Sequence, residues 1–276
     1  MTERLSLTQD GVEMVEYPSN IKQCVAEAAI AWRDFLAQPD DTKQRYAALS
    51  LQSGTGYEKK GDGQRESKDI KENFDITRAS LADLTPMSTH DPATAQFVTA
   101  ASTLFDELEQ FIVAQGEHIE QNYGIAGFAA EAAASARSAF VRFLYYPPVA
   151  VGTVIGEPHI DHSGFTFHLY ESTDGCERLD PASRNWLPMP VAENQAAMFA
   201  SMQTQLYGHG EIPGLCHRIL ANGVTAKVGR TAIVCFVPLI STPRYDRGTH
   251  GRLQEMTPGF NYDMSPDIFE QYFITI

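Results

Sequence analysis

The feature of this sequence that most restricts its fold is a change of pattern near residue 137. Before it, apolar residues recur at the spacing of one helical face; after it, short runs of strand-forming residues are separated by glycine and proline. Helices and strands do not alternate along the chain, which argues against a parallel sheet with crossover helices. The order predicts an α+β fold with a mainly β core, and the short strands favour a double-sheet jelly roll.

The first half predicts three helices. One begins at Asn20, a suitable capping residue, and ends before Pro39, because proline cannot continue a helix. A shorter helix follows Asp40 and runs to Tyr46. A long helix follows Pro92 and carries an apolar stripe until the sequence reaches Gly124.

The second half predicts strands over residues 140–146, 159–170, 196–201, 215–221 and 231–237. No linker separates the two halves, so the simplest organisation is a single domain over residues 1–276. Its parts would be a mainly helical segment (1–136), a jelly-roll core (137–240) and a C-terminal covering segment (241–276).

Composition and charge argue against several classes of protein. The formal net charge is −14 and the acidic residues are scattered, so we expect no nucleic-acid partner. No apolar run reaches the roughly 20 residues of a membrane-spanning helix, so we expect no membrane partner. The N-terminus lacks a signal-peptide pattern and the four cysteines form no close pair, which is typical of a cytoplasmic protein. The oligomeric state stays open, and a monomer is compatible with the sequence.

Three residues have the chemistry and spacing of a metal site. His159 and Asp161 are two positions apart in a predicted strand, so both side chains point to one face. His217 lies in another predicted strand, and its imidazole would complete a face of two histidines and one carboxylate. This ligand set leaves positions open and is typical of Fe(II) oxygenases. Alone, a His-x-Asp triplet is a weak signal, because an isolated strand histidine is more often a core or surface residue.

Arg230 adds to this pattern, because it follows His217 and opens the last predicted strand. Its guanidinium presents a fixed set of donors that matches a carboxylate with two hydrogen bonds. An arginine at the start of a strand is more often a surface residue. After the His-x-Asp triplet and the distal histidine, however, it is the natural anchor for the far carboxylate of 2-oxoglutarate.

The motifs resemble a known family, the isopenicillin N synthase-like 2-oxoglutarate and Fe(II)-dependent oxygenases. The segment from His159 to Thr166 is similar to the first metal motif of that family, and Cys216 to Leu220 is similar to the second. The resemblance spans roughly residues 20 to 240, and further matching segments occur in the family's order at 35–43, 56–57, 71–74, 142–148 and 236–238.

The resemblance implies a distorted double-stranded β-helix with helices packed outside. It also implies Fe(II), 2-oxoglutarate and O2 as cofactor and co-substrates, with ascorbate as a support in vitro, and a role for Tyr146 beside Arg230 in binding the oxoacid. The expected reaction is hydroxylation of an unactivated C–H bond in a small molecule, with succinate and CO2 as co-products.

Two positions depart from the family pattern. Ala232 stands where the family usually has a serine, two residues after the oxoacid arginine, and Leu144 stands where many members have an asparagine. One lost hydrogen bond to a charged group weakens binding by roughly 1.5–3 kcal/mol. Thr231 and Thr153 are the candidates to replace the missing hydroxyl.

Candidate substrate residues follow from strand parity and from charge. Phe165 and Phe167 would share the metal-facing side of a continuous strand, although packing in the core is an equal alternative. Beyond Pro238 an irregular segment carries three arginines, which would attract a carboxylate-bearing substrate if it covers the site: Arg244, Arg247 and Arg252.

Three alternative functions stay open. The first is an Fe(II)/O2 oxidase of the cyclase or desaturase type that uses no oxoacid, which Ala232 and Leu144 would allow. The second is a non-catalytic metal-containing binding protein, although structural metal sites usually have four protein ligands. The third is a zinc hydrolase with the same ligands, for which no general base stands at a suggestive spacing.

Overall fold

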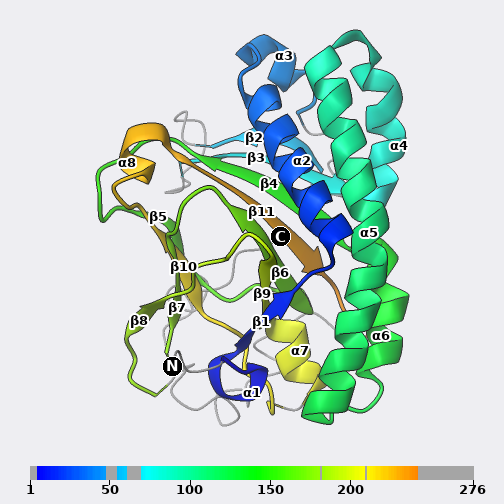
Figure 1. The fold of residues 1–276 in the computed structure, drawn as a ribbon, viewed down its shortest axis with the longest axis vertical. Coiled ribbons are helices and arrows are strands. Elements are labelled where there is room, and N and C mark those ends of the chain that lie inside the picture. Colours follow the sequence, from blue (N-terminus) through cyan, green and yellow to red (C-terminus); the bar gives the residue numbers. More distant parts are fainter. Residues whose placement is uncertain (1–4, 48–54, 61–69, 181, 209, 242–276) are drawn as a thin grey trace, which may run out of the picture.

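A computed structural model describes residues 5–47, 55–60, 70–180, 182–208 and 210–241. Its centre consists of two antiparallel sheets that face each other (Figure 1). The major sheet has, in spatial order, β1 (Val12–Glu16), β9 (Gln195–Ala200), β6 (Phe165–Glu171), β11 (Arg230–Val237), β4 (Phe140–Tyr146), β3 (Glu72–Thr77) and β2 (Gly56–Lys59). The minor sheet has β5 (Val154–His159), β10 (His217–Leu220), β7 (Cys176–Leu179) and β8 (Trp186–Pro188).

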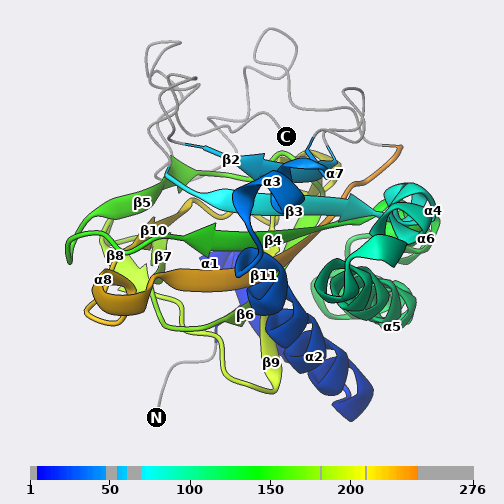
Figure 2. The same ribbon diagram turned by 90° about the horizontal axis from the view of Figure 1, so that it is seen from above.

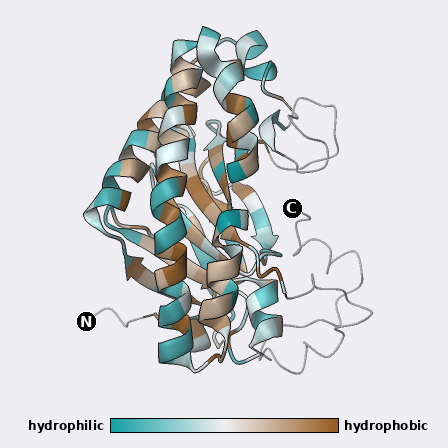
Figure 3. Cartoon of the chain, turned by 90° about the vertical axis from the view of Figure 1, so that its right-hand side faces the viewer, coloured by the Kyte–Doolittle hydropathy of each residue, from teal (hydrophilic) through white to brown (hydrophobic). Residues whose placement is uncertain are grey.

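Helices cover the face of the major sheet that points away from the minor sheet (Figures 1 and 2). The two longest, α2 (Ser19–Leu36) and α5 (Pro92–Tyr123), pack against each other, and apolar residues of both join those of the major sheet in one core cluster. Figure 3 looks onto this side and shows hydrophobic strand residues behind the helices. The remaining helices are α1 (Leu7–Asp10), α3 (Asp40–Gln44), α4 (Arg78–Met87), α6 (Phe128–Ser135), α7 (Met202–Tyr207) and α8 (Thr225–Val228).

Local chemistry explains the bounds of α5. Asp91 caps its first turn by accepting a hydrogen bond from the backbone N–H of Thr94, and Pro92 occupies the first helical position, where no N–H is needed. The helix ends at Gly124, whose φ of 72° lies in the left-handed region that glycine adopts easily. The predicted start and end of this helix are therefore confirmed.

One predicted strand is wrong. The segment 159–170 is not continuous, because β5 ends at His159 in the minor sheet and β6 begins at Phe165 in the major sheet. The chain crosses between the sheets at residues 160–164. There the backbone N–H of Gly164 donates to the carbonyl of Val237 at 2.8 Å, and a Cβ at Gly164 would lie only 2.5 Å from the side chain of Leu239.

Among the described residues, no helix combines the length and the apolar character that crossing a lipid bilayer requires.

Candidate metal centre

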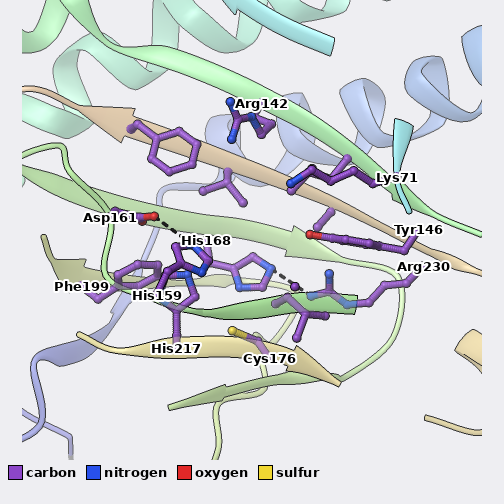
Figure 4. A pocket seen from close by; sticks show the side chains of 16 residues that line it. Lys71, Arg142, Tyr146, His159, Asp161, His168, Cys176, Phe199, His217 and Arg230 are labelled. Atoms are coloured by element: carbon purple, nitrogen blue, oxygen red, sulfur yellow. Dashed lines mark hydrogen bonds and ion pairs between the residues drawn. The ribbon is translucent and has the colours of Figure 1, made fainter. Parts of the chain in front are cut away.

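The structure brings His159, Asp161 and His217 together at one end of the space between the sheets (Figure 4). His159 and His217 are direct partners in the antiparallel pairing of β5 with β10, and their ring centroids lie 4.3 Å apart. Asp161 follows two residues after His159, in the crossing segment. One ligand atom from each of the three residues lies within 4.8 Å of the others.

Backbone carbonyls fix the orientation of both imidazoles. Nδ1 of His159 lies 2.7 Å from the carbonyl oxygen of Glu157, and Nδ1 of His217 lies 3.3 Å from that of Leu215. A carbonyl oxygen only accepts, so each Nδ1 carries the proton and each Nε2 keeps a lone pair for a metal. This is the arrangement in which metal-binding histidines are usually held.

Asp161 is oriented by a neighbour on β6. Its Oδ2 accepts a hydrogen bond of 2.7 Å from the hydroxyl of Thr166, while its Oδ1 lies 3.4 Å from Nε2 of His159. Burial alone would raise the pKa of Asp161, but the contacts with His159, His217 and Thr166 lower it well below its usual value. The carboxyl group is therefore ionised and can act as a ligand at neutral pH.

The donor set fits a divalent metal. Burial and the neighbouring His159 lower the pKa of His217 to about 4, so its imidazole is neutral at physiological pH. Two imidazoles and one carboxylate on one side of a metal suit Fe(II) and leave positions open on the other side. Among the described residues, no other group of three potential ligand side chains lies this close together.

The three residues line a pocket between the sheets. Alternate residues of β4 and β11 form one wall, with Tyr146 and Arg230 at one end and Arg142 and Phe236 toward the other. Arg230 and Tyr146, which were predicted to bind the oxoacid, line the same pocket as the three candidate metal ligands.

Arg230 is 1% exposed and is held by three groups. Its Nη2 forms a 2.6 Å ion pair with Glu171 and lies 3.4 Å from Nε2 of His168, and its Nε donates to the carbonyl of Thr173 at 3.2 Å. Its guanidinium lies 5.9 Å from the ring centroid of Tyr146. Nη1 has no hydrogen-bond partner among the described residues.

Sequence reasoning missed Glu171 and His168. His168 lies on β6 two residues after Thr166, so both side chains point toward the pocket. The sequence could have identified His168, because residues two positions apart in a strand lie on the same face. Burial and the nearby Arg230 lower the pKa of His168 to about 3. Glu171 gave no sequence signal, because its pairing with Arg230 depends on the neighbouring positions of β6 and β11.

The predicted substrate residues Phe165 and Phe167 do not line the pocket. They face the helices: the Phe167 ring lies 5.0 Å from that of Phe111, and the Phe165 ring 5.7 Å from that of Phe128. The prediction assumed an unbroken strand from His159. Because the chain crosses between the sheets at residues 160–164, the alternation of side chains counted from His159 does not continue into β6. Arg244, Arg247 and Arg252 lie outside the described residues.

Neither threonine proposed to replace the serine hydroxyl lines the pocket. The hydroxyl of Thr153 donates to the carbonyl of Ala150 at 2.7 Å, and the buried Thr231 lies on the other face of β11. His168 lines the pocket beside Arg230, and Glu171 pairs with Arg230 without lining the pocket.

Comparison with solved structures identifies the fold. A full-length protein of Neurospora crassa in complex with alpha-KG superposes with a TM-score of 0.63 at 16% identity, covering 84% of this chain and 76% of that one. The dioxygenase for auxin oxidation of rice gives 0.62 at 20% identity, covering 91% and 87%. Dioxygenase for auxin oxidation 1 from Arabidopsis thaliana, in a complex with 2-oxoglutarate, gives 0.62 at 17% identity, covering 88% and 89%.

No protein-family model and no curated protein sequence matches the chain. At these identities the solved structures show a common fold, which is the double-stranded β-helix with helices outside. The fold implied by the sequence motifs is therefore confirmed, in the form of two facing antiparallel sheets that do not close into a barrel.

Proposed function

We propose that this protein is a 2-oxoglutarate- and Fe(II)-dependent dioxygenase. It would hydroxylate a C–H bond of a small molecule with one O2, while 2-oxoglutarate leaves as succinate and CO2. The observation that carries the proposal is an open set of His159, Asp161 and His217 in one pocket with a buried arginine. The comparisons support it, because proteins of the same fold were crystallised with alpha-KG or 2-oxoglutarate.

The three residues that would hold iron are oriented by hydrogen bonds within the protein. When bound to His159, Asp161 and His217, iron would supply the activation of O2 and the oxidation of the C–H bond. The carbonyls of Glu157 and Leu215 hold the two imidazoles, and Thr166 holds the carboxylate, so the ligands are oriented before a metal binds.

Arg230 would bind the far carboxylate of 2-oxoglutarate. Glu171, His168 and the carbonyl of Thr173 fix its guanidinium and leave Nη1 for a ligand. Tyr146 lies directly opposite Arg230 in the pairing of β4 with β11, and its ring lines the same end of the pocket. Ala232 and Leu144 line the wall next to them as apolar residues, so they contribute shape and no hydrogen bond.

A small-molecule substrate is consistent with the enclosed pocket. The Neurospora crassa protein was crystallised with thymine and with 5-formyluracil, and the two plant proteins are dioxygenases for auxin oxidation. By analogy we propose a small organic substrate for this chain, and we propose that residues 1–276 form one catalytic domain.

The test is conversion of 2-oxoglutarate to succinate by metal-free protein supplied with Fe(II), ascorbate and O2. We expect succinate from the wild type, none from His217→Ala, and full activity from His90→Ala, which alters an exposed histidine outside the pocket. Slow turnover without the true substrate is sufficient for detection. If the wild type makes no succinate and 2-oxoglutarate produces no absorbance band on the Fe(II) form under argon, the proposal is wrong.

One observation favours a second candidate, an Fe(II)/O2 oxidase that uses no oxoacid. The charge of Arg230 is already balanced by Glu171, and both side chains are at most 2% exposed. Arg230→Met separates the two functions. Loss of 2-oxoglutarate binding in this variant supports the dioxygenase, whereas O2 consumption that depends neither on 2-oxoglutarate nor on Arg230 supports the oxidase.

A further inference from the structure

The pocket contains a second guanidinium, that of Arg142, at a distance from the first. Arg142 and Arg230 lie on the neighbouring antiparallel strands β4 and β11, where Tyr146 pairs with Arg230 and Arg142 pairs with Val234. The two arginines are thus four residues apart along the strand direction, or about 13 Å. Both line the pocket, and the metal ligands line it too (Figure 4).

We propose that Arg142 binds an anionic group of the substrate, and that this group is a carboxylate on an otherwise apolar molecule. The inference rests on the proposed function, because it assigns the Arg230 end of the pocket to 2-oxoglutarate and the Arg142 end to the molecule that is oxidised.

The position of Arg142 is prepared before any ligand binds. Asp75 on β3 accepts two hydrogen bonds from it, 2.8 Å from Nε to Oδ1 and 2.7 Å from Nη2 to Oδ2. The guanidinium also lies over the ring of Phe236 at 5.5 Å and over that of Phe140 at 5.8 Å, and these two rings are stacked 4.6 Å apart. A guanidinium held on three sides loses little freedom when it binds a ligand.

One edge of the guanidinium stays available. Asp75 uses Nε and Nη2, and Nη1 has no hydrogen-bond partner among the described residues. Burial by itself would lower the pKa of Arg142, but the carboxylate of Asp75 raises it above its usual value, so the charge is permanent. The side chain is 16% exposed, which is consistent with contact between this edge and the pocket.

The charges on the pocket wall favour a negative ligand group. Lys71, Arg142 and Arg230 are the cationic side chains that line it. Asp161, a candidate metal ligand, is the one carboxylate among the described lining residues, and Asp75, which pairs with Arg142, does not line the pocket. Lys71 is buried and lines the same pocket.

Apolar side chains make up much of the wall of the pocket that contains both the anion position and the candidate metal ligands. They accept a hydrocarbon or aromatic body and offer it no hydrogen bonds: Leu144, Phe199, Ile219, Ala232, Val234 and Phe236. A carboxylate at Arg142 would therefore orient the apolar part of the substrate, with its C–H bonds, toward His159, Asp161 and His217.

The test measures direct binding to the metal-free full chain by isothermal titration calorimetry. The probes are phenylacetate, 3-phenylpropionate and hexanoate, each compared with its own amide, which has the same shape and no charge. We expect at least one acid to bind about tenfold or more tightly than its amide, the size of effect that a charged hydrogen bond gives. If no acid is preferred over its amide in the wild type, the proposal is overturned.

Variants test whether Arg142 is the source of the preference for an acid over its amide. Arg142→Gln alone would leave Asp75 buried without its partner, so the main variant is the double change Arg142→Gln with Asp75→Asn, which removes both charges. We expect it to bind acid and amide equally, Arg142→Lys to keep part of the preference, and the control Arg78→Gln, which alters a surface ion pair with Asp106, to behave as the wild type. An undiminished preference in the double variant overturns the proposal, and circular dichroism verifies that each variant is folded.

Binding of 2-oxoglutarate to Mn(II)-loaded protein separates this inference from the proposed function. We expect an affinity within about threefold of wild type in the Arg142 double variant and a loss of tenfold or more in Arg230→Met. The reverse result would make Arg142 the co-substrate arginine and overturn the inference. A preserved preference for acids together with no succinate formation would instead overturn the dioxygenase while leaving the anion position standing.

Discussion

The two ends of the pocket are built on the same plan but differ in how tightly each arginine is enclosed. Arg230 is almost completely buried and shares its Nη2 between Glu171 and His168. Arg142 forms two parallel hydrogen bonds with Asp75, and its side chain remains 16% exposed. The difference shows how one pocket can contain two guanidinium groups with separate tasks, since each carboxylate partner fixes which nitrogen faces the ligand.

The two histidines of the candidate metal centre come from the opposite sheet. His159 and His217 are carried by β5 and β10 of the minor sheet, whereas both arginines belong to the major sheet. A change in the ligands should therefore affect events at both ends of the pocket, and a change in either arginine should affect only its own end.

The largest effect is expected from His217→Ala, which removes one ligand of the shared centre. Loss of a partner that only orients a ligand already weakens metal binding about 10–100-fold, so loss of the ligand itself should weaken it more than about 100-fold. Titration with Co(II), followed by its visible absorbance, measures this. His118→Ala, at a histidine that pairs with Glu13 and does not line the pocket, is the control. An unchanged Co(II) affinity in His217→Ala would show that the metal binds elsewhere.

The second-largest effect is the loss of unfolding free energy when either arginine loses its carboxylate partner. Glu171→Gln leaves Arg230 buried with an unbalanced charge, and breaking such a buried pair typically costs about 3–5 kcal/mol of unfolding free energy. Asp75→Asn should cost less, because Arg142 is partly exposed to water in the pocket. Urea unfolding at pH 7 gives both values. Equal losses would remove the distinction that we draw between the two ends.

A third prediction concerns pH at the Arg230 end. Burial, together with Arg230, lowers the pKa of His168 to about 3 in the folded protein, against 6.5 as the ordinary value. Below about pH 6.5 the unfolded chain binds a proton at this residue and the folded chain does not. Stability should therefore fall as the pH decreases from about 6.5 to 3. Between pH 7 and pH 4 we expect the free energy of unfolding of His168→Gln to fall by about 3 kcal/mol less than that of wild type. Each pH unit over which only the unfolded chain binds this proton contributes about 1.36 kcal/mol.

Urea unfolding at several pH values tests this prediction, and the matched control is Tyr170→Phe on the same strand, which should keep the wild-type pH dependence between pH 7 and pH 4. Parallel stability curves for His168→Gln and wild type would mean that His168 titrates normally in the folded protein.

The smallest effect is expected from Tyr146→Phe, which keeps the ring beside Arg230 and removes the hydroxyl. Loss of one hydrogen bond to a bound oxoacid is worth about 1 kcal/mol, or roughly fivefold in affinity. Equilibrium dialysis of 2-oxoglutarate against Mn(II)-loaded protein measures it, with Tyr170→Phe on β6 as the control outside the pocket. A loss as large as that of Arg230→Met would make the tyrosine a principal anchor.

Much of the fold followed from local chemistry. The predicted bounds of α5 and β4 agree with the structure because Asp91, Gly124 and the proline after Tyr146 act on their own neighbours in the chain. The metal ligands were predicted for a related reason, since a histidine and an aspartate two residues apart stay close in any extended segment. Here the structure places them at the end of β5 and in the segment that follows it.

The alternation of side chains between the two faces of a strand gave a wrong prediction where the chain crosses from one sheet to the other. Phe165 and Phe167 were predicted to face the metal, but the crossing segment at residues 160–164 turned them toward the helices and placed Thr166 and His168 on the pocket side. A period of two carries information only along an unbroken strand.

The sequence alone determined most of the segments that become helix or strand and the neighbouring candidate ligands His159 and Asp161, because these depend on residues within a few positions. Only the tertiary structure brings His217 beside them, through the pairing of β10 with β5, and decides the partners of the charged residues. Glu171 lies 59 residues from Arg230, and Asp75 lies 67 from Arg142. Strand order and register bring each pair together, and a buried arginine remains charged at low cost only when a carboxylate from a neighbouring strand balances it.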